Sequence, residues 1–317
     1  MKLVQTLVVR DEADIVDAQI AYHLAAGVDF VLATDHDSED GTTDVLRRYE
    51  REGILKLYRE VGEMRESDWR TRMAREAASE YGADWVLNTD ADEFWIPREH
   101  TLKESLAAVP TGVGVVWATT CHFVPRPEDG SLFAERMTAR FAATAALNDP
   151  TSPYRPHAKA AHRPDPAIRV RFGSHRVVSD TLMPLPAWHP ADVFHFPYRT
   201  RAQYEEKTVR RARGDKPLGQ YVKGLQAKEQ GRIEDVYSKL VVDDEALARG
   251  VAAGSLVVDT RLRDGLRTPG STAVESPEPR FALDEAALRD SDVVRLVRRL
   301  DELRTRVAAL AERPWAR

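Results

Sequence analysis

The stretch Trp85-Val86-Leu87-Asn88-Thr89-Asp90-Ala91-Asp92-Glu93-Phe94-Trp95 is the most informative part of this chain. An apolar run at its start is followed by three acidic residues, Asp90, Asp92 and Glu93. This pattern predicts a buried strand whose carboxyl end delivers carboxylates to a cleft. In an extended chain, Asp90 and Asp92 are two residues apart, so their side chains are expected on the same face.

Two neighbouring carboxylates repel each other and are costly to remove from water. A divalent cation offsets that cost, and the hard ions Mg²⁺ and Mn²⁺ prefer oxygen ligands. An Asp-x-Asp triplet in isolation is more often a solvated turn, but here it follows a buried strand. We therefore expect Asp90 and Asp92 to bind Mn²⁺ or Mg²⁺.

The first half of the chain alternates strand and helix patterns. Strands are predicted at 3–9, 30–33, 54–58 and 85–89, and helices at 11–26, 44–51 and 67–81, the last capped by Ser67. Apolar strands alternating with amphipathic helices predict an α/β fold, a mostly parallel sheet with helices on both faces. Ligands bind such sheets at the carboxyl ends of the strands, so the loops at 10–12, 35–40 and 90–93 should share one edge.

The pattern changes after residue 110. Further strands are predicted at 113–118, 168–172, 175–178 and 193–196, and the segment 125–166 reads as long loops. A basic helix begins near Thr200 and carries Arg201 and Lys207. We divide the chain into a domain at 1–215 and a mainly helical C-terminal extension at 216–317.

The extension ends in an apolar stripe with alternating spacings of three and four, the pattern of a coiled-coil seam. It serves either a homodimer or packing against its own domain. The stripe is Val293, Leu296, Leu300, Leu303, Val307 and Leu310.

Composition excludes several classes of protein. The formal net charge of −5 argues against nucleic-acid binding. The single cysteine, Cys121, excludes an intrachain disulfide and a cysteine-based zinc site. We find neither a signal peptide nor a run near the roughly 18–20 apolar residues of a membrane span. A cytoplasmic protein is expected, with peripheral membrane association left open.

Three motifs together resemble the family 2-like glycosyltransferases, which have the nucleotide-binding GT-A fold. They are the segments 7–14 and 35–42 and the triplet Asp90-Ala91-Asp92. The second motif departs from the usual family form at His36 and Asp37 but matches it at Asp35, Ser38, Asp40, Gly41 and Thr42. The residues around Asp92-Glu93-Phe94 are closest to the family 2-like and family 92-like branch. The resemblance covers roughly residues 1–210.

This resemblance implies roles for individual residues. Asp35 would accept a hydrogen bond from the nucleotide base, and Arg10 to Glu12 would contact base or ribose. Asp90 would lie near the ribose and the metal, and Asp92 would bind the metal. A late histidine completes many such metal sites, and His195 is our choice, against the alternative of a hydrogen-bonded core histidine.

The implied reaction transfers a sugar from a nucleotide-sugar donor to a glycan, lipid-linked or small-molecule acceptor. The departing diphosphate is stabilised by the metal and by cationic side chains. Candidates for those cations are Arg72, Lys159, Arg199, Arg201 and Lys207. Resemblance favours inversion, which needs a general base. Glu93, His175, Asp149 and Asp192 are the candidates, and Asp92 acts through its metal.

Other functions stay open at this point. A nucleotidyltransferase shares the fold and the metal, although the loop from Arg10 to Ala13 lacks the glycines that such enzymes usually carry. A non-catalytic nucleotide-binding or glycan-binding protein would show no metal dependence. A haloacid dehalogenase-type phosphatase needs Thr or Val where Phe94 stands.

Overall fold

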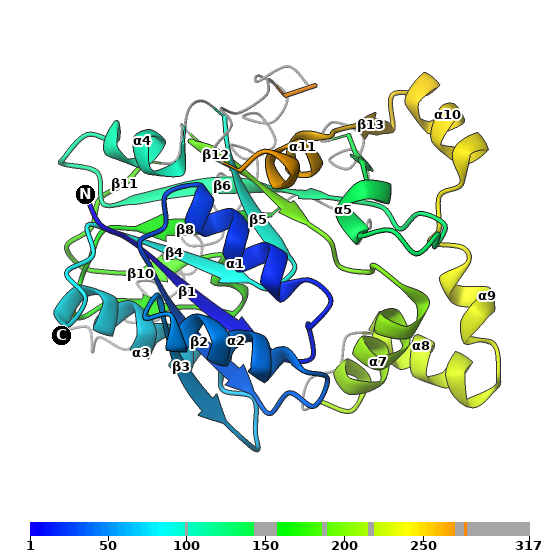
Figure 1. Ribbon diagram of the computed structural model, residues 1–317, viewed down its shortest axis with the longest axis horizontal. Coiled ribbons are helices and arrows are strands. Elements are labelled where there is room, and N and C mark those ends of the chain that lie inside the picture. The colour runs from blue at the N-terminus through cyan, green and yellow to red at the C-terminus, as the bar shows by residue number, and fades with distance from the viewer. Residues whose placement is uncertain (99–100, 143–156, 186–188, 215–218, 270–275, 278–317) are drawn as a thin grey trace, which may run out of the picture.

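The computed structural model describes residues 1–98, 101–142, 157–185, 189–214, 219–269 and 276–277. Over these residues the predicted α/β fold is confirmed, as a nine-stranded mixed sheet with helices on both faces (Figure 1). The first part of the chain forms β1 (Leu3–Val9), α1 (Val16–Ala25), β2 (Phe30–His36), α2 (Thr42–Arg51), β3 (Leu55–Glu60), α3 (Glu66–Ser79), β4 (Trp85–Asp90), β5 (Glu93–Pro97) and α4 (Leu102–Ala107).

The middle of the chain adds short strands and two brief helical turns. They are β6 (Val115–His122), α5 (Phe133–Arg136), β7 (Ala139–Phe141), β8 (Ala158–His162), β9 (Arg169–Val170), η1 (Phe172–Ser174), β10 (Val177–Val178), β11 (Pro184–Leu185) and β12 (Ala191–His195). The later part is mostly helical, with α7 (Arg201–Ala212), α8 (Gly219–Glu229), α9 (Ile233–Tyr237), α10 (Asp244–Ala252), β13 (Leu256–Val258) and α11 (Arg261–Arg267).

The sheet is parallel in one half and mixed in the other. Strand order is β3-β2-β1-β4-β8-β6-β12-β5, with β11 attached to β6. The first four strands are mutually parallel. β8 runs antiparallel to both of its neighbours, and β12 is parallel to β6 but antiparallel to β5. The predicted mostly parallel sheet therefore describes the N-terminal half well and the second half less well.

Alternation along β1 explains why helices cover both faces. Leu3 and Leu7 belong to a core cluster shared with α1 and α2, whereas Val4 and Val8 belong to one shared with α3. Successive side chains of a strand point to opposite faces, and all four of these are buried. Burial of an aliphatic side chain contributes about 1.5–3 kcal/mol, so both helical layers are held strongly.

Three expectations about elements are corrected. α1 begins at Val16 rather than near residue 11, because residues 10–15 form a loop. Ser67 lies inside α3, and Arg65 stands at the cap position without a side-chain cap. The segment predicted as long loops contains β8, a strand paired on both sides. β8 is only five residues long and alanine-rich, which hides it from a reading by periodicity.

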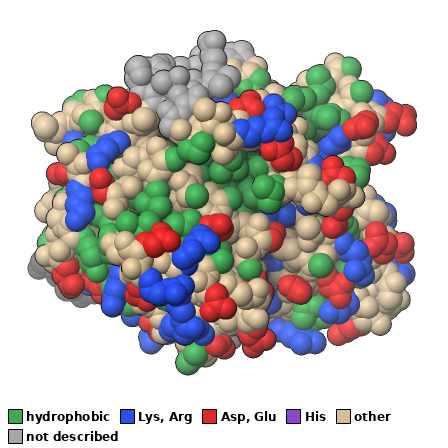
Figure 2. Space-filling model, in the orientation of Figure 1, with side chains coloured by type: hydrophobic (Ala, Val, Ile, Leu, Met, Phe, Trp, Pro, Cys, Tyr) green, Lys and Arg blue, Asp and Glu red, His purple; other side chains and the backbone are tan. Residues whose placement is uncertain are grey.

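The helices α7, α8 and α9 lie to one side of the sheet (Figure 1) and share an aromatic cluster that includes Tyr204 and Tyr237. β13 pairs with β7, which ties the later part of the chain back to the middle. On the face shown in Figure 2, acidic and basic side chains are interspersed. The predicted seam at 293–310 and the candidate base Asp149 lie outside the described residues. No helix in the described ranges is long and apolar enough to cross a membrane.

Candidate active site

The carboxyl ends of three parallel strands meet at one edge of the sheet. In register, Val9 of β1 lies beside Asp35 of β2, and Val8 lies beside Asp90 of β4. The loop after β1 is bound to the loop after β2, with the Glu12 backbone N–H donating to Thr42 Oγ1 at 2.9 Å. The expectation that the three motif loops share an edge is confirmed, and the site is built here.

Asp35 is fully buried at the end of β2, and its side chain organises the second motif. Oδ1 accepts from the backbone N–H of Ser38 at 3.1 Å and from its hydroxyl at 2.6 Å, while Oδ2 accepts from the Thr43 hydroxyl at 2.5 Å. Arg59 Nε lies 3.5 Å from Oδ2. Both carboxylate oxygens therefore already have partners within the loop. Contact with a nucleotide base stays a prediction.

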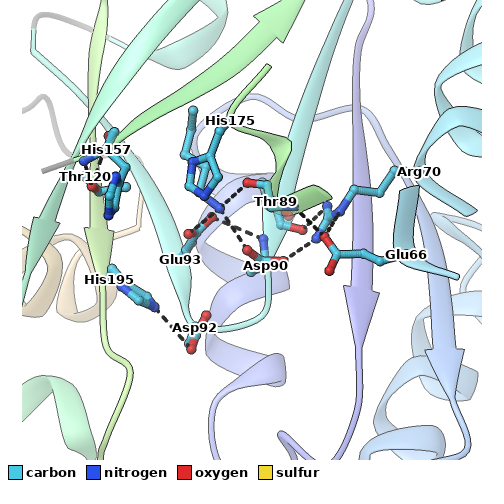
Figure 3. A network of polar contacts seen from close by, with 12 residues as sticks. Glu66, Arg70, Thr89, Asp90, Asp92, Glu93, Thr120, His157, His175 and His195 are labelled. Carbon is cyan, nitrogen blue, oxygen red and sulfur yellow. Dashed lines mark hydrogen bonds and ion pairs between the residues drawn. The ribbon is translucent and has the colours of Figure 1, made fainter. Parts of the chain in front are cut away.

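The Asp-x-Asp triplet is not extended, which corrects the expectation of a shared face. β4 ends at Asp90, a turn follows at residues 91–92, and β5 starts at Glu93. The two aspartates therefore reach different partners (Figure 3). Asp90 accepts from Arg70 of α3, and its Oδ2 lies 2.9 Å from Nζ of Lys159. Burial alone raises the pKa of Asp90, but Lys159 and Arg70 outweigh it and hold that pKa below its usual value.

Asp92 is brought to His195 by the pairing of β5 with β12. His195 is in register with Glu93, and the Phe196 backbone N–H donates to the Asp92 carbonyl at 2.9 Å. As a result, Nε2 of His195 lies 3.4 Å from Oδ2 of Asp92. The same oxygen accepts from Nζ of Lys207 at 2.7 Å. Burial raises the pKa of Asp92, but Lys207 and His195 outweigh it and hold that pKa well below its usual range.

The other ring nitrogen of His195 also has a defined partner. His195 Nδ1 lies 2.9 Å from Nδ1 of His122, the last residue of β6. One ring therefore donates and the other accepts across this contact. When His195 is the donor, its Nε2 carries the lone pair that faces Asp92, which is the tautomer a metal ligand needs.

Glu93 and Lys159 form the inner side of the site. Lys159 Nζ lies 2.7 Å from Oε1 of Glu93 and donates to the Gly173 carbonyl at 2.7 Å. Burial raises the pKa of Glu93 to about 7, against the opposing influence of Lys159. Lys159 therefore bridges Asp90, Glu93 and the turn of η1.

His175 follows that turn and is partly exposed. Its Nδ1 lies 3.0 Å from the carbonyl of Ala158, beside Lys159 in the chain. Desolvation, with the Lys159 charge, lowers the pKa of His175 to about 4, so the ring is neutral at pH 7. Among the other candidate bases, Asp192 is fully buried and accepts from Arg98 and Arg261 at 3.0 Å each. Because both oxygens of Asp192 are held in ion pairs, we withdraw it as a base.

Arg199 is fully buried, and its guanidinium is already paired within the protein. Its guanidinium donates to Glu12, to Asp14 and to the Phe196 carbonyl. Burial raises the pKa of Glu12 even with Arg199 beside it. The predicted contact of Arg199 with a diphosphate stays a prediction, but its donors are already engaged.

Arg10 and Arg72 lie outside this ion network. Arg10 Nε lies 3.4 Å from Oδ2 of Asp11. Arg72 of α3 donates to Glu60 at 2.7 Å and stacks on Tyr58. It also lines a cavity of about 590 Å³, together with Glu60, Val61, Glu63, Arg65, Asp68 and Trp69. Nε and Nη2 of Arg72 are buried without a hydrogen-bond partner.

Sequence reasoning missed Arg70, Glu66 and His122. Arg70 is fully buried and donates to Glu66 at 2.9 Å as well as to Asp90. A Glu–Arg pair four residues apart on a helix reads as a solvated ion pair. α3 needs an apolar face toward the sheet, and Arg70 directly follows Trp69, which is buried on α3. That position was the signal in the sequence that Arg70 could be buried.

Comparison with known protein families gives a match over the N-terminal part of the chain. Residues 4–111, about a third of the chain, match the model of glycosyltransferase family 92. The match bears out the resemblance to glycosyltransferases read from the three motifs, in its family 92-like branch. No curated protein matches the chain.

Among solved structures, TarS 1–349 of S. aureus in complex with UDP-GlcNAc is similar at 14% identity over 88% of this chain and 98% of that one, with a TM-score of 0.39. A longer TarS chain is similar at 15% identity and a TM-score of 0.34, over 73% of this chain. This chain spans only 43% of that TarS chain. A 4-diphosphocytidyl-2C-methyl-D-erythritol synthase is similar at 12% identity over 51% of this chain and 75% of that one, with a TM-score of 0.30.

Proposed function

We propose that this protein is a metal-dependent glycosyltransferase that moves a sugar from a nucleotide-sugar donor to an acceptor hydroxyl with inversion. The observation that carries the proposal is the meeting of Asp92 and His195 at the carboxyl edge of the sheet. Around that pair lie the buried cations Arg70, Lys159, Arg199 and Lys207. Carboxylate, imidazole and cations in one site suit a substrate with a diphosphate.

The residues present fit a divalent ion of the Mg²⁺ or Mn²⁺ type. Asp92 and His195 offer an oxygen and a nitrogen 3.4 Å apart, close enough for both to ligate one ion. No group of three or more His, Cys, Asp or Glu ligands occurs in the described ranges. Mg²⁺ commonly takes only one or two protein ligands and completes its shell with water and substrate phosphates. Asp90 stays a predicted ligand, although Arg70 and Lys159 now hold its oxygens.

The charge of the site supports the same proposal. The carboxylates of Glu12, Asp14, Glu66, Asp90, Asp92 and Glu93 face the four buried cations Arg70, Lys159, Arg199 and Lys207. When all of these groups are ionised, their net charge is −2, which one divalent ion would balance. Burial raises the pKa values of Glu12 and Glu93 in spite of the cations beside them.

Each part then has a chemical task. The metal supplies Lewis-acid stabilisation of the leaving diphosphate. Arg72, which lines the cavity beside β3 and α3, supplies a positive charge for the donor there. His175 is neutral and partly exposed, so an acceptor hydroxyl reaches it more readily than it reaches Glu93, which is buried against Lys159. We assign His175 as the preferred general base.

A donor screen tests the proposal. Purified protein is incubated with UDP-, GDP-, ADP-, CDP- and dTDP-sugars, with Mn²⁺ or with EDTA, and release of nucleoside diphosphate is measured. We expect release from one donor class in Mn²⁺ only, and its loss in Asp92→Asn. Release of pyrophosphate from a nucleoside triphosphate and a sugar phosphate would instead indicate a nucleotidyltransferase. Nucleotide binding with neither turnover nor metal dependence would overturn the proposal.

A further inference from the structure

Two side chains meet one oxygen of Asp92. Oδ2 accepts from Nζ of Lys207 at 2.7 Å and lies 3.4 Å from Nε2 of His195. Lys207 is buried and comes from α7, seven residues after Thr200, the end of the loop that follows β12. Lys207 therefore pairs with the same Asp92 oxygen that faces His195.

An ammonium and a divalent cation cannot share that oxygen without strong repulsion. Like charges in contact with one carboxylate oxygen repel most in a buried, low-dielectric setting. Asp92 and Lys207 are both almost fully buried. A metal held by Asp92 and His195 therefore displaces Lys207 from Oδ2, and the displaced ammonium needs another anion.

Lys207 is held by fewer bonds than Arg199, the other cation beside Glu12. Besides Asp92, it contacts the Pro197 carbonyl at 3.1 Å and Glu12 at 4.0 Å. Glu12 is already paired with Arg199. Arg199, in contrast, is fixed by bonds to two carboxylates and a carbonyl. A lysine also swings on a flexible four-carbon stem, whereas a guanidinium is held as a rigid fork.

We infer that Lys207 is a competing counter-ion: it holds Asp92 while no metal is bound, and on metal binding it is released to the donor diphosphate. This inference rests on the proposed function. Metal alone then binds weakly, because it has to displace the ammonium. Metal and diphosphate bind cooperatively, because the diphosphate supplies the new partner for Lys207, and that coupling is reciprocal.

The competition between Lys207 and the metal is tested by measuring Mn²⁺ binding to the nucleotide-free protein, with free Mn²⁺ measured by electron paramagnetic resonance. We expect Lys207→Met, and equally Lys207→Gln, to bind Mn²⁺ at least tenfold more tightly than wild type. The gain should vanish when Asp92→Asn is added. Arg210→Met is the matched control, because Arg210 lies one turn further along α7 and pairs with Asp11 rather than Asp92, at 2.6 Å. It should leave Mn²⁺ affinity within about twofold.

The cooperativity between metal and diphosphate is tested first in the wild-type protein. UDP and GDP are titrated with and without Mn²⁺, after correction for the Mn²⁺–diphosphate complex in solution. Saturating Mn²⁺ should tighten the better of the two ligands at least tenfold, and this factor should fall in Lys207→Met. Circular dichroism confirms that each variant is folded.

The outcomes separate the two proposals. Unchanged or weaker Mn²⁺ binding in both Lys207 variants overturns the counter-ion inference, and the proposed function then still stands if Asp92→Asn abolishes the metal binding of wild type. Independent binding of Mn²⁺ and diphosphate in wild type also overturns the inference. Absence of Mn²⁺ binding in every variant, with or without UDP or GDP, overturns both.

Discussion

Nε of Arg199 lies 2.7 Å from Oδ2 of Asp14, which joins the loop after β12 to the loop after β1. Nη2 of the same fully buried guanidinium donates to Glu12. Removing the cation leaves the buried Glu12 with only the more distant Lys207, at 4.0 Å, and takes the ion pair away from the partly exposed Asp14. Loss of one partner of a buried ion pair costs about 3–5 kcal/mol.

Arg199→Met is therefore expected to lower the free energy of unfolding by about 3–5 kcal/mol, measured by urea denaturation. Arg210→Met, which breaks a more exposed pair with Asp11, should cost about 1 kcal/mol or less. A stable Arg199→Met protein that has lost nucleoside diphosphate binding would instead support the role first predicted for this residue, as a cation for the diphosphate.

The two aspartates of the triplet should behave differently. Asp92→Asn is expected to abolish Mn²⁺-linked nucleotide binding while the far-ultraviolet circular dichroism stays that of wild type. Asp90→Asn leaves Arg70 and Lys159 with one acceptor fewer and should mainly lower stability, by about 1–3 kcal/mol. Normal metal-linked binding in Asp92→Asn would show that the metal assignment is wrong.

Asp35 carries a prediction about the nucleotide. Asp35→Ala should weaken nucleoside diphosphate binding by about 1–3 kcal/mol, the scale of a lost hydrogen bond to a charged acceptor. Thr43→Val is the matched control, since it removes the internal bond to Oδ2, together with a bond from Arg59, and leaves the Asp35 carboxylate in place. Equal losses in both variants would mean that Asp35 acts by shaping its loop, and an unchanged dissociation constant in Asp35→Ala would remove it from the site.

Stability should fall in mild acid because of two buried histidines. His23 donates from Nδ1 to the Gln19 carbonyl and accepts the Trp95 backbone N–H at Nε2, so it is held neutral. Burial lowers the pKa of His23, and likewise that of His162, to about 4. The unfolded chain, with a pKa near 6.5, binds more protons between pH 6.5 and 4, so the stability present above pH 6.5 is lost as pH falls.

For each histidine the loss at pH 5 amounts to about 2 kcal/mol relative to pH 7.5. His23→Gln, whose amide oxygen can accept the same N–H, should remove the His23 share of this loss, about 2 kcal/mol. Urea denaturation at pH 7.5, 6 and 5 gives the slopes. An identical slope in His23→Gln and wild type would contradict the assignment.

Much of the site's placement was predictable from sequence. β1 appears where its apolar run predicts it, and the acidic ends of β2 and β4 follow from runs that stop at Asp35 and Asp90. Because parallel strands end at one edge, the loops had to converge there. His195 was singled out for its position at the end of a short strand, and the structure brings it to Asp92.

The partners of these residues were not predictable. Only two residues separate β4 from β5, and the turn between them directs Asp92 away from Asp90, a reversal that carries no glycine or proline signal. Lys159 lies on a strand that has no apolar alternation beyond its alanines. The contact between His122 and His195 depends on the register of β6 with β12, which joins residues 73 positions apart. Such pairings are set by the whole sheet and leave no local pattern.

The position of β8 between β4 and β6 has a consequence for synthesis. On the ribosome, β4 emerges with β1 as its neighbour, but its second partner is not made until residues 158–162 have been added. β5 is paired later still, because its partner among the described strands is β12, which ends at His195. Until then, the nascent chain carries strand edges with unpaired N–H and C=O groups, the kind that recruit other chains. The family-matched segment 4–111 on its own therefore leaves an open sheet, and a fragment cut there should aggregate where the chain continued past residue 195 stays dispersed.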